Sequence, residues 1–490
     1  MLTAAACGGS SGFRPDGGGG SGGAGGGAGN RLTGTLPTTI NRNVDVLFMI
    51  DDSSEMRLAQ TNLINNFPTF MTTLQSAPQG LPNLHLAVVS QDMGAGDGSI
   101  SGCDALGGKK GIFQYTPRGT CAATHLQAGA TYISNIAGAA NYTGDIADVF
   151  ACIAALGEAG CGFEHQFAAI LRALGADNQG AAPAENQGFL RPEAYLVIVM
   201  LTNEDDCSAA PGVPLYDTRS NTNIASQLGP PANFRCNEFG HTCPTGVSED
   251  IIRTVPHPDR NAPNHDVTQA ITYEGCTSDD TEGYLLGVKY TADQIKALKT
   301  DPSMVSVVSL SGPPTPYTVR WMNPSAADSS CGAASCPWPV IGHSCNANDG
   351  SFADPGVRDI QLANEFGTNS LPLSICDASF APALQRIGLL VNTLVQPPCI
   401  PGPIGLDPAT GGPDCKITMT SGGSTKTLPA CADDGGVPPC WQLVQGNCNG
   451  NGFALQVSPD PNLPASAAAT ISYSCGTCVA GMPDPARGCP

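Results

Sequence analysis

The sequence predicts an α/β fold: a doubly wound, mostly parallel sheet flanked by helices, with long disulfide-stapled loops and a small cysteine-rich β-type C-terminal region. Three observations support this prediction. Strongly apolar runs alternate with stretches of helical periodicity, the apolar runs end in acidic and hydroxyl residues, and the intervening loops carry closely spaced cysteines. Alternation of buried strands with amphipathic helices is typical of parallel sheets covered by helices.

The first apolar run, residues 44–50, ends abruptly in polar residues. Asp51 and Asp52 follow it directly, and Ser53 and Glu55 lie just beyond. Ligands of a parallel sheet bind at the carboxyl ends of its strands. Carboxylate and hydroxyl oxygens gathered there suit a hard divalent cation, either Mg²⁺ or Ca²⁺.

The next elements alternate along the chain as the fold class requires. In chain order we predict a helix at 63–74, a strand at 84–90, a helix at 163–174, a strand at 195–202, a helix at 291–299, a strand at 304–310 and a helix at 384–394. The first helix contains Pro68, which should kink or split it. The strand at 195–202 is the most apolar and again ends in acids, with Asn203, Glu204 and Asp205 after it.

The cysteine content indicates an oxidising compartment. The chain has 21 cysteines, and Cys7 is set apart from the others by a glycine-rich stretch. Small residues lead into Cys7 as in a bacterial lipobox, where the cysteine becomes the lipidated first residue. The remaining even number of cysteines is consistent with ten disulfides. A further thiol in a disordered tail is the alternative interpretation of Cys7.

Several cysteines lie close to one another in sequence and suggest local disulfides. We expect the pairs Cys103 with Cys121, Cys152 with Cys161, Cys236 with Cys243, and Cys331 with Cys336. Connectivity does not follow from spacing alone, so these pairs are hypotheses.

Changes in composition divide the chain into four parts. We predict a lipobox remnant of a signal peptide at 1–7, a flexible Gly/Ser-rich tether at 8–42, the α/β domain at 43–396 and a disulfide-stapled region at 397–490. Glycine-rich sequence such as residues 17–29 behaves as flexible coil. No run of apolar residues is long enough for a transmembrane helix.

The charge balance excludes two classes of partner. The chain carries 42 acidic and 22 basic residues, for a net charge of −20. Such a chain has no surplus of lysine and arginine to neutralise phosphates, so nucleic acid is not expected as a partner. Contact with a membrane is expected only through the lipid on Cys7.

Three segments together resemble von Willebrand factor A-type (vWA) domains. They are the strand and acidic loop at 44–56, the segment 160–164 before a helix, and the strand end at 201–208. The resemblance covers residues 43–396. The whole pattern of the chain is similar to that of a group of large bacterial vWA lipoproteins with a Gly-rich tether and many cysteines. It implies a vWA/Rossmann-like sheet and a bound divalent cation whose coordination is completed by an acidic group of a ligand.

The resemblance also implies which residues hold the cation. The metal-site pattern Asp-x-Ser-x-Ser is met by Asp51 and Ser53, with Glu55 in the third place, and Asn203 and Asp205 complete the candidate set. No threonine stands at the family's threonine position near residues 161–164, and Asn203 stands where the family has aspartate. The carboxylates of Glu55, Glu164 and Asp205 are expected to compensate for these departures from the family's ligand set. A site that has lost its metal is the alternative.

Enzyme motifs are poorly represented. The seven histidines lack zinc-type spacing and no His-Glu-x-x-His is present, so we expect no enzymatic activity and no catalytic residue. The leading hypothesis is a binding or adhesion module of the cell envelope, at the outer membrane or cell surface, that engages a protein or glycan ligand. A structural envelope protein with a vestigial metal site is the alternative, and a secreted hydrolase has least support.

Overall fold

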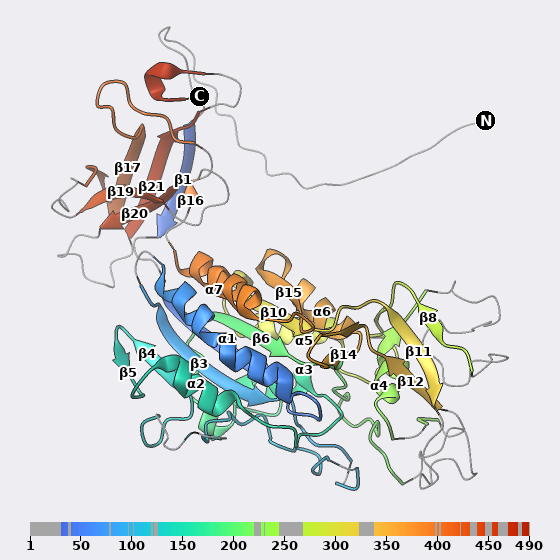
Figure 1. Cartoon of the computed structure of the whole chain (residues 1–490). Helices are drawn as coiled ribbons and strands as arrows, with labels where there is room; N and C mark the ends of the chain where they lie inside the picture. The colour runs from blue at the N-terminus through green and yellow to red at the C-terminus, as the bar shows by residue number, and fades with distance from the viewer. Residues whose placement is uncertain are drawn as a thin grey trace, which may run out of the picture. The chain divides into compact units, whose positions relative to one another are not determined.

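The fold was examined in a computed structural model of the whole chain (Figure 1). The structure describes residues 31–37, 41–77, 80–96, 98–100, 102–118, 121, 126–219, 227–229, 231–244, 268–322, 338–396, 399–400, 403–421, 423–431, 439–445, 453–458, 469–478 and 483–489. The chain divides into two compact units. The larger unit comprises residues 39–397, and the smaller comprises 1–38 together with 398–490.

A seven-stranded mixed sheet forms the centre of the larger unit (Figure 1). Its order is β15 (Ser370–Ser374), β10 (Val305–Ser311), β6 (Tyr195–Leu201), β2 (Asn43–Ile50), β3 (Asn83–Ser90), β4 (Ile133–Ile136) and β5 (Ala139–Ala140). The first five strands are parallel, and β4 and β5 add an antiparallel edge. The α/β class predicted from sequence is confirmed.

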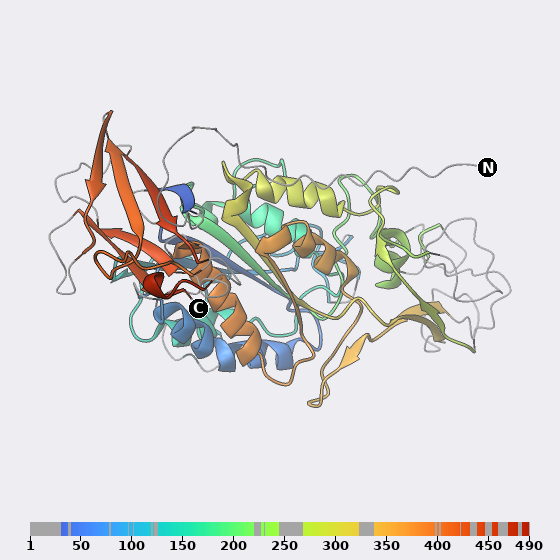
Figure 2. The same ribbon diagram turned by 90° about the horizontal axis from the view of Figure 1, so that it is seen from above.

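Helices cover both faces of this sheet because alternate residues of its buried strands point to opposite sides. One core contains Val46 and Phe48 of β2 and side chains of α1 (Arg57–Gln75), α2 (Ile146–Ala154) and α7 (Ala381–Val395). The other contains Leu47 and Met49 with α3 (Gln166–Leu174), α5 (Val288–Lys296) and α6 (Val357–Asn364). Figure 2 shows α1 and α7 on one side of the sheet and α3 and α5 on the other.

The predicted elements are present, with shifted ends. Helix α1 runs unbroken through Pro68, so the predicted split is wrong. The helix expected at 163–174 begins only at Gln166, and Phe163 instead packs in a separate loop core with Tyr216. Helices α2 and α6 and strand β15 were not anticipated from the sequence.

The remaining elements of the larger unit are short. They are α4 (Phe234–Gly240), β7 (His241–Thr242), β8 (Ile271–Tyr273), β9 (Thr277–Ser278), β11 (Tyr317–Met322), β12 (Trp338–Gly342), β13 (Cys345–Asn346) and β14 (Phe352–Ala353), with the 3₁₀ turns η1 (Ala184–Asn186), η2 (Pro302–Met304) and η4 (Gly367–Asn369). Strands β8, β11 and β12 form a separate antiparallel sheet. No helix within the described ranges is both long and apolar enough to cross a membrane.

Disulfides staple the loops as predicted, but between different partners. Among the described residues of the larger unit, the bonds are Cys103–Cys161, Cys121–Cys152, Cys207–Cys236, Cys243–Cys276 and Cys345–Cys376. Three of the predicted local pairs are therefore wrong, and Cys331 with Cys336 lies outside the described residues. The fold brings together loops that follow different strands, which sequence spacing does not reveal.

The smaller unit is a β-sandwich with its own core. One sheet has the order β1 (Arg31–Pro37), β21 (Ala469–Gly476), β17 (Cys415–Ser421), β18 (Ser424–Leu428), and the other β16 (Cys399–Ile400), β20 (Phe453–Ser458), β19 (Cys440–Gln445). The turn η5 (Pro485–Arg487) follows. Ile417 and Ile471 of the first sheet pack with Trp441 and Leu455 of the second. Disulfides Cys415–Cys475, Cys431–Cys440 and Cys478–Cys489 reinforce it.

One predicted boundary is wrong. Residues 8–42 were expected to be a flexible tether, but Arg31–Pro37 within that range form β1 and pair with β21. The strand lies outside the glycine-rich part and alternates hydroxyl with apolar residues, a pattern that fits a half-buried strand. The rest of the tether up to residue 30 and the predicted lipidation site Cys7 lie outside the described residues.

Candidate metal site

The candidate site lies where the parallel neighbours β2 and β6 end. Ile50 pairs with Leu201, so the loops that follow both strands leave the sheet side by side. The backbone N–H of Asp51 donates to the carbonyl of Leu201 at 2.9 Å. Two segments separated by about 150 residues thereby meet at one edge, as the sequence predicted.

Asp51 is fully buried and held in place on both sides. Its Oδ1 accepts from the Ser53 N–H at 2.8 Å, and its Oδ2 accepts from the Thr202 hydroxyl at 2.9 Å. The Gln166 amide in turn donates to the Thr202 hydroxyl at 3.0 Å. Burial raises the pKa of Asp51 to about 6, although the hydrogen bonds from Ser53 and Thr202 oppose this shift.

Several buried oxygens near Asp51 have no hydrogen-bond partner. They are Ser53 Oγ, Glu164 Oε1, Gln166 Oε1 and Asn203 Oδ1. Ser53 and Glu164 are each 1% exposed and Asn203 is 3% exposed, so bulk water does not satisfy them. Buried polar atoms are almost always paired in folded proteins. Each of these acceptor oxygens is of a kind that ligates a hard divalent cation.

Two glutamates interact with each other in the segments before α3 and after β6. The carboxyl groups of Glu164 and Glu204 are hydrogen-bonded to each other, and Asn233 Nδ2 donates to Glu204 Oε2 at 2.5 Å. Burial raises the pKa of Glu164 well above its usual range, and the charges of Glu204 and Asp51 add to this. Burial and then the charge of Asp354 raise the pKa of Glu204 to about 8.

The structure separates the five residues predicted from sequence. Asp51 and Ser53 follow the end of β2, and Asn203 follows the end of the neighbouring strand β6. Glu55 is exposed, has a φ of 76°, and shows no contact with Asp51. Asp205 lies nearby in sequence, but its carboxylate accepts from the N–H groups of Arg358 and Asp359. Asp205 therefore stabilises the start of α6 in this structure.

Glu164 and Glu204 complete the set of acids at this edge. The sequence analysis named Glu164, in the segment before α3, as one of three carboxylates expected to compensate for missing ligands. Glu204 was not singled out, although it lies within the acidic run that follows β6. The only sequence feature that could have indicated Glu204 is the acidic run 203–206, whose residues have different partners in the structure.

Two disulfides and one short contact position Glu164. The loop before it is tied to a distant loop by Cys103–Cys161, and the chain after β6 is tied to α4 by Cys207–Cys236. The Cys207 N–H donates to the Glu164 carbonyl at 2.6 Å. Gln91 Oε1 accepts from the N–H of the next residue, His165, at 3.0 Å.

Asp52 faces β3, the neighbour of β2 on the side away from β6, and is not one of the candidate cation ligands. Its carboxylate forms an ion pair with Lys109 and accepts from the Ser90 hydroxyl at 2.6 Å. Lys109 Nζ also lies 3.6 Å from Asp92 Oδ2, so Asp52 and Asp92 share one lysine. The first acid of the Asp51-Asp52 pair keeps its ligand capacity, whereas the second is already neutralised.

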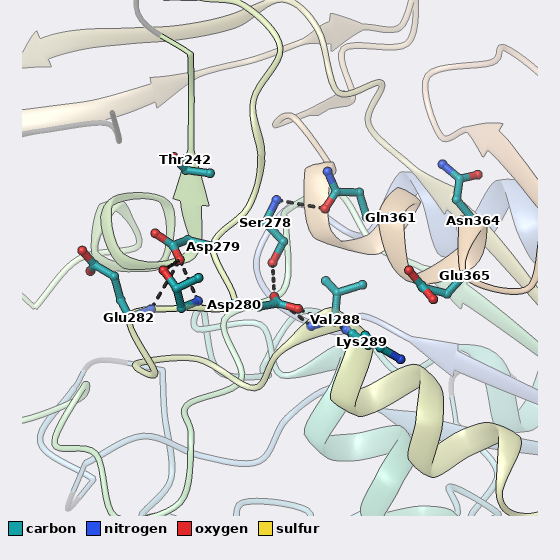
Figure 3. A pocket seen from close by; sticks show the side chains of 11 residues that line it. Thr242, Ser278, Asp279, Asp280, Glu282, Val288, Lys289, Gln361, Asn364 and Glu365 are labelled. Atoms are coloured by element: carbon teal, nitrogen blue, oxygen red, sulfur yellow. Dashed lines mark hydrogen bonds between the residues drawn. The ribbon is translucent and has the colours of Figure 1, made fainter. Parts of the chain in front are cut away.

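A polar cavity of about 680 Å³ lies away from these residues (Figure 3). It is lined by Thr242, Ser278, Asp279, Asp280, Thr281, Glu282, Val288, Lys289, Gln361, Asn364 and Glu365. Asp280 accepts from the N–H groups of Val288 and Lys289 at the start of α5, at 3.0 and 3.1 Å. Asp280 in Figure 3 thus has structural partners, and the cavity does not include Asp51 or Asn203.

Comparisons with known proteins leave the family open. No family model matches the chain, and no curated protein matches it. Among solved structures, the pilus adhesin SpaC from Lactobacillus rhamnosus GG in its open conformation is similar with a TM-score of 0.30 and 14% identity, over 92% of this chain and 41% of the adhesin. The chain thus spans less than half the length of that adhesin.

Two further solved structures carry von Willebrand factor domains. The vWF domain of the type V pili tip protein Mfa5 from Porphyromonas gingivalis has a TM-score of 0.30 and 12% identity, over 74% of this chain and 98% of that domain. The von Willebrand factor type A protein from Catenulispora acidiphila has a TM-score of 0.27 and 10% identity, over 91% and 60%. At such low scores, these likenesses support no inference about this chain.

Proposed function

We propose that the chain is an extracytoplasmic binding module whose larger unit is a doubly wound, vWA-type domain with a divalent-cation site. The five parallel strands, the helices on both faces and the Asp-x-Ser loop after β2 support the proposed domain type. The cation, Mg²⁺ or Ca²⁺, would be held by Asp51, Ser53, Glu164, Asn203 and Glu204. It would supply open coordination positions for an oxygen of a protein or glycan ligand.

One observation carries this proposal: two almost fully buried acceptor oxygens, Glu164 Oε1 and Asn203 Oδ1, lack a hydrogen-bond partner. Leaving such groups unpaired costs about 1–3 kcal/mol each, which cation binding would recover. Within the described residues, no three His, Cys, Asp or Glu side chains are arranged to hold a metal as they stand. Cation binding would therefore require hydroxyl and amide oxygens and would separate the hydrogen-bonded carboxyls of Glu164 and Glu204.

The disulfides support a location outside the cytoplasm. Eight disulfides lie in the described residues, and such density is typical of oxidising compartments. We propose that lipid on Cys7 anchors the chain in the cell envelope, as the lipobox-like sequence before it suggests. Gly8 after Cys7 favours the outer membrane or cell surface. Mass analysis of the N-terminal peptide from envelope fractions tests the anchor.

The test of the metal site is calorimetric titration of the metal-free chain with Ca²⁺ and Mg²⁺. Asp51→Asn keeps the size of the side chain but removes its charge, so we expect at least about a tenfold loss of affinity. Asp148→Asn is the matched control, because Asp148 is an exposed aspartate on α2. If the parent chain gives neither heat nor a thermal shift with either cation, a structural protein with a vestigial site becomes the better interpretation.

A further inference from the structure

The polar cavity of Figure 3 has an unbalanced charge. Among the described residues that line it, one is basic, Lys289, and four are acidic: Asp279, Asp280, Glu282 and Glu365. We propose that this cavity binds a small organic polycation of the aliphatic polyamine class, with its ammonium groups against the carboxylates. The cavity contains none of the candidate cation ligands, so binding there is independent of the proposed function.

Lysines near the cavity do not balance its acids. Lys289 Nζ donates to both carboxylate oxygens of Asp293 at 2.9 and 3.2 Å, and Asp293 does not line the cavity. Lys296 Nζ lies 3.6 Å from Glu365 Oε2, too far for a hydrogen bond, so it offsets at most one of the four charges. Three of the four acids are exposed, and carboxylates in contact with water are ionised at neutral pH. The surplus of negative charge favours a positively charged ligand.

The wall of the cavity that follows β9 is fixed by contacts within the protein. Ser278, at the end of β9, donates its N–H to Gln361 Oε1 of α6 at 2.9 Å. Its hydroxyl donates to Asp280 Oδ1 at 2.8 Å, and Asp280 also accepts from the start of α5. These contacts tie β9, α5 and α6 together around the cavity. A preformed wall reduces the entropy lost when a ligand binds.

The acids lie on more than one side of the cavity. Figure 3 shows Asp279 and Glu282 on one side and Glu365 on the other. Asp279 Oδ1 accepts from the N–H groups of the turn that follows it, and no described hydrogen bond involves its Oδ2. A ligand that reaches both sides needs more than one positive charge. Methylene groups between its ammonium groups can contact Val288, which also lines the cavity.

The size of the cavity and the spread of its acids favour an organic cation over a metal ion. A metal ion needs its ligands within about 2.0–2.6 Å of one point. No three acidic, histidine or cysteine side chains of the described ranges converge in this way. The volume of about 680 Å³ is instead typical of sites for small organic molecules, which span roughly 300–1,000 Å³.

Calorimetric titration of the full chain with spermidine tests the site. At physiological ionic strength we expect spermidine to bind at least about tenfold tighter than butylamine, which carries a single charge. Trilysine, titrated in parallel, presents the same ammonium groups as a basic segment of a partner protein would. Equal affinity for spermidine and butylamine overturns the proposed site. Tighter binding of trilysine than of spermidine overturns the assignment to a small polyamine.

Two double variants separate the cavity from the net charge of −20, which attracts any polycation. Asp279→Asn with Glu365→Gln removes one carboxylate from each side, and the amide oxygen at position 279 can still accept from the turn. We expect this variant to lose about tenfold in spermidine affinity. Asp148→Asn with Glu193→Gln removes the same charge from exposed positions outside the cavity, so its affinity should stay within about twofold of the parent. Equal losses in both variants overturn the proposed site.

Amide hydrogen exchange locates the bound ligand in the parent chain, whatever the stability of the variants. Saturating spermidine should slow exchange in the turn 279–282 and at the end of α6, because binding stabilises both walls of the cavity. Exchange in β2 and β6 should change less. Spermidine binding that leaves exchange at both walls unchanged places the ligand elsewhere and overturns the proposed site.

Discussion

At the scale of single residues, neighbouring acids on one loop have different roles because each faces a different strand end. Asp51 faces β6, where its carboxylate accepts a hydrogen bond from the Thr202 hydroxyl. Asp52 faces β3, where Lys109 neutralises it. The sequence shows two equivalent acids, and only the position of the neighbouring loops determines which of them remains available to a cation.

The raised pKa values of Glu164 and Glu204 make stability depend on pH. Burial raises the pKa of Glu204 from 4.5 to about 8, so between these values the folded chain binds a proton that the unfolded chain has lost. The unfolded state then binds fewer protons, and the free energy of unfolding falls as pH rises. We expect the urea midpoint of the metal-free chain to decrease across this window.

Three further measurements check whether Glu164 and Glu204 cause this pH dependence. Glu204→Gln should flatten the decrease because it removes one partner of the pair, and saturating Ca²⁺ should raise the midpoint most at the alkaline end. Asp148→Asn should reproduce the parent curve. A midpoint that rises with pH across the same window contradicts the assignment.

At the scale of elements, the segment after β6 organises two helices as well as the candidate metal site. The Asp205 carboxylate accepts from the first N–H groups of α6, and Asp206 Oδ1 accepts from the Phe167 N–H at the start of α3. Helix starts leave backbone N–H groups unpaired, and carboxylates satisfy them while also complementing the helix dipole. Asn203 and Glu204, which precede Asp205 in the chain, remain candidate cation ligands.

Replacement of Asp205 separates its structural role from metal binding. Asp205→Ala removes the acceptor for two N–H groups and the partner of His241, whose Nε2 lies 2.7 Å from Oδ2. We expect a loss of roughly 2–4 kcal/mol in the free energy of unfolding, measured by urea denaturation. The Ca²⁺ affinity of the folded variant should stay within a few-fold of the parent chain.

The matched control is Asp145→Ala at the start of α2. Asp145 is an exposed cap that accepts from the Ala147 N–H at 2.7 Å, so its loss should cost only about 1 kcal/mol. Equal costs for the two variants would show that burial of Asp205 adds nothing. A large loss of Ca²⁺ affinity in Asp205→Ala would return this residue to the set of cation ligands.

Much of the larger unit could be predicted from periodicity because its strands are buried on both faces. The apolar runs before Asp51 and Asn203 identify β2 and β6, and parallel pairing then requires their ends to meet. The direction of Asp205 could not be predicted, because it depends on α6, which follows more than 150 residues later. The disulfide partners of Cys103 and Cys161 depend in the same way on loops that only the folded sheet brings together.

At the scale of the whole molecule, the smaller unit is built from both ends of the chain. Strand β1 pairs with β21 over seven residues, from Arg31 with Gly476 to Pro37 with Thr470. The Arg31 guanidinium also donates to Asp414 at 2.9 Å and to the Ser474 carbonyl at 2.8 Å. The segment after the glycine-rich stretch therefore contributes structure to a sheet that is otherwise C-terminal.

Deletion of residues 1–38 tests this arrangement. Removal of β1 leaves β21 as an edge strand with unpaired N–H groups, so amide hydrogen exchange in β21 should become faster. The sheet order, both helix-covered cores and five disulfides of the larger unit lie within 39–397. Exchange in β2, β3 and β6, and the Ca²⁺ affinity, should therefore match those of the full chain.

Amide exchange in β19, β2 and β6 serves as the comparison for the exchange expected in β21. Strand β19 belongs to the second sheet of the smaller unit, where it pairs with β20, so its exchange should change less than that of β21. Unchanged protection of β21 after the deletion would mean that β1 adds no stability and that residues 31–37 serve only as connection. Faster exchange in β2 or β6 would show instead that the two units unfold as one cooperative structure.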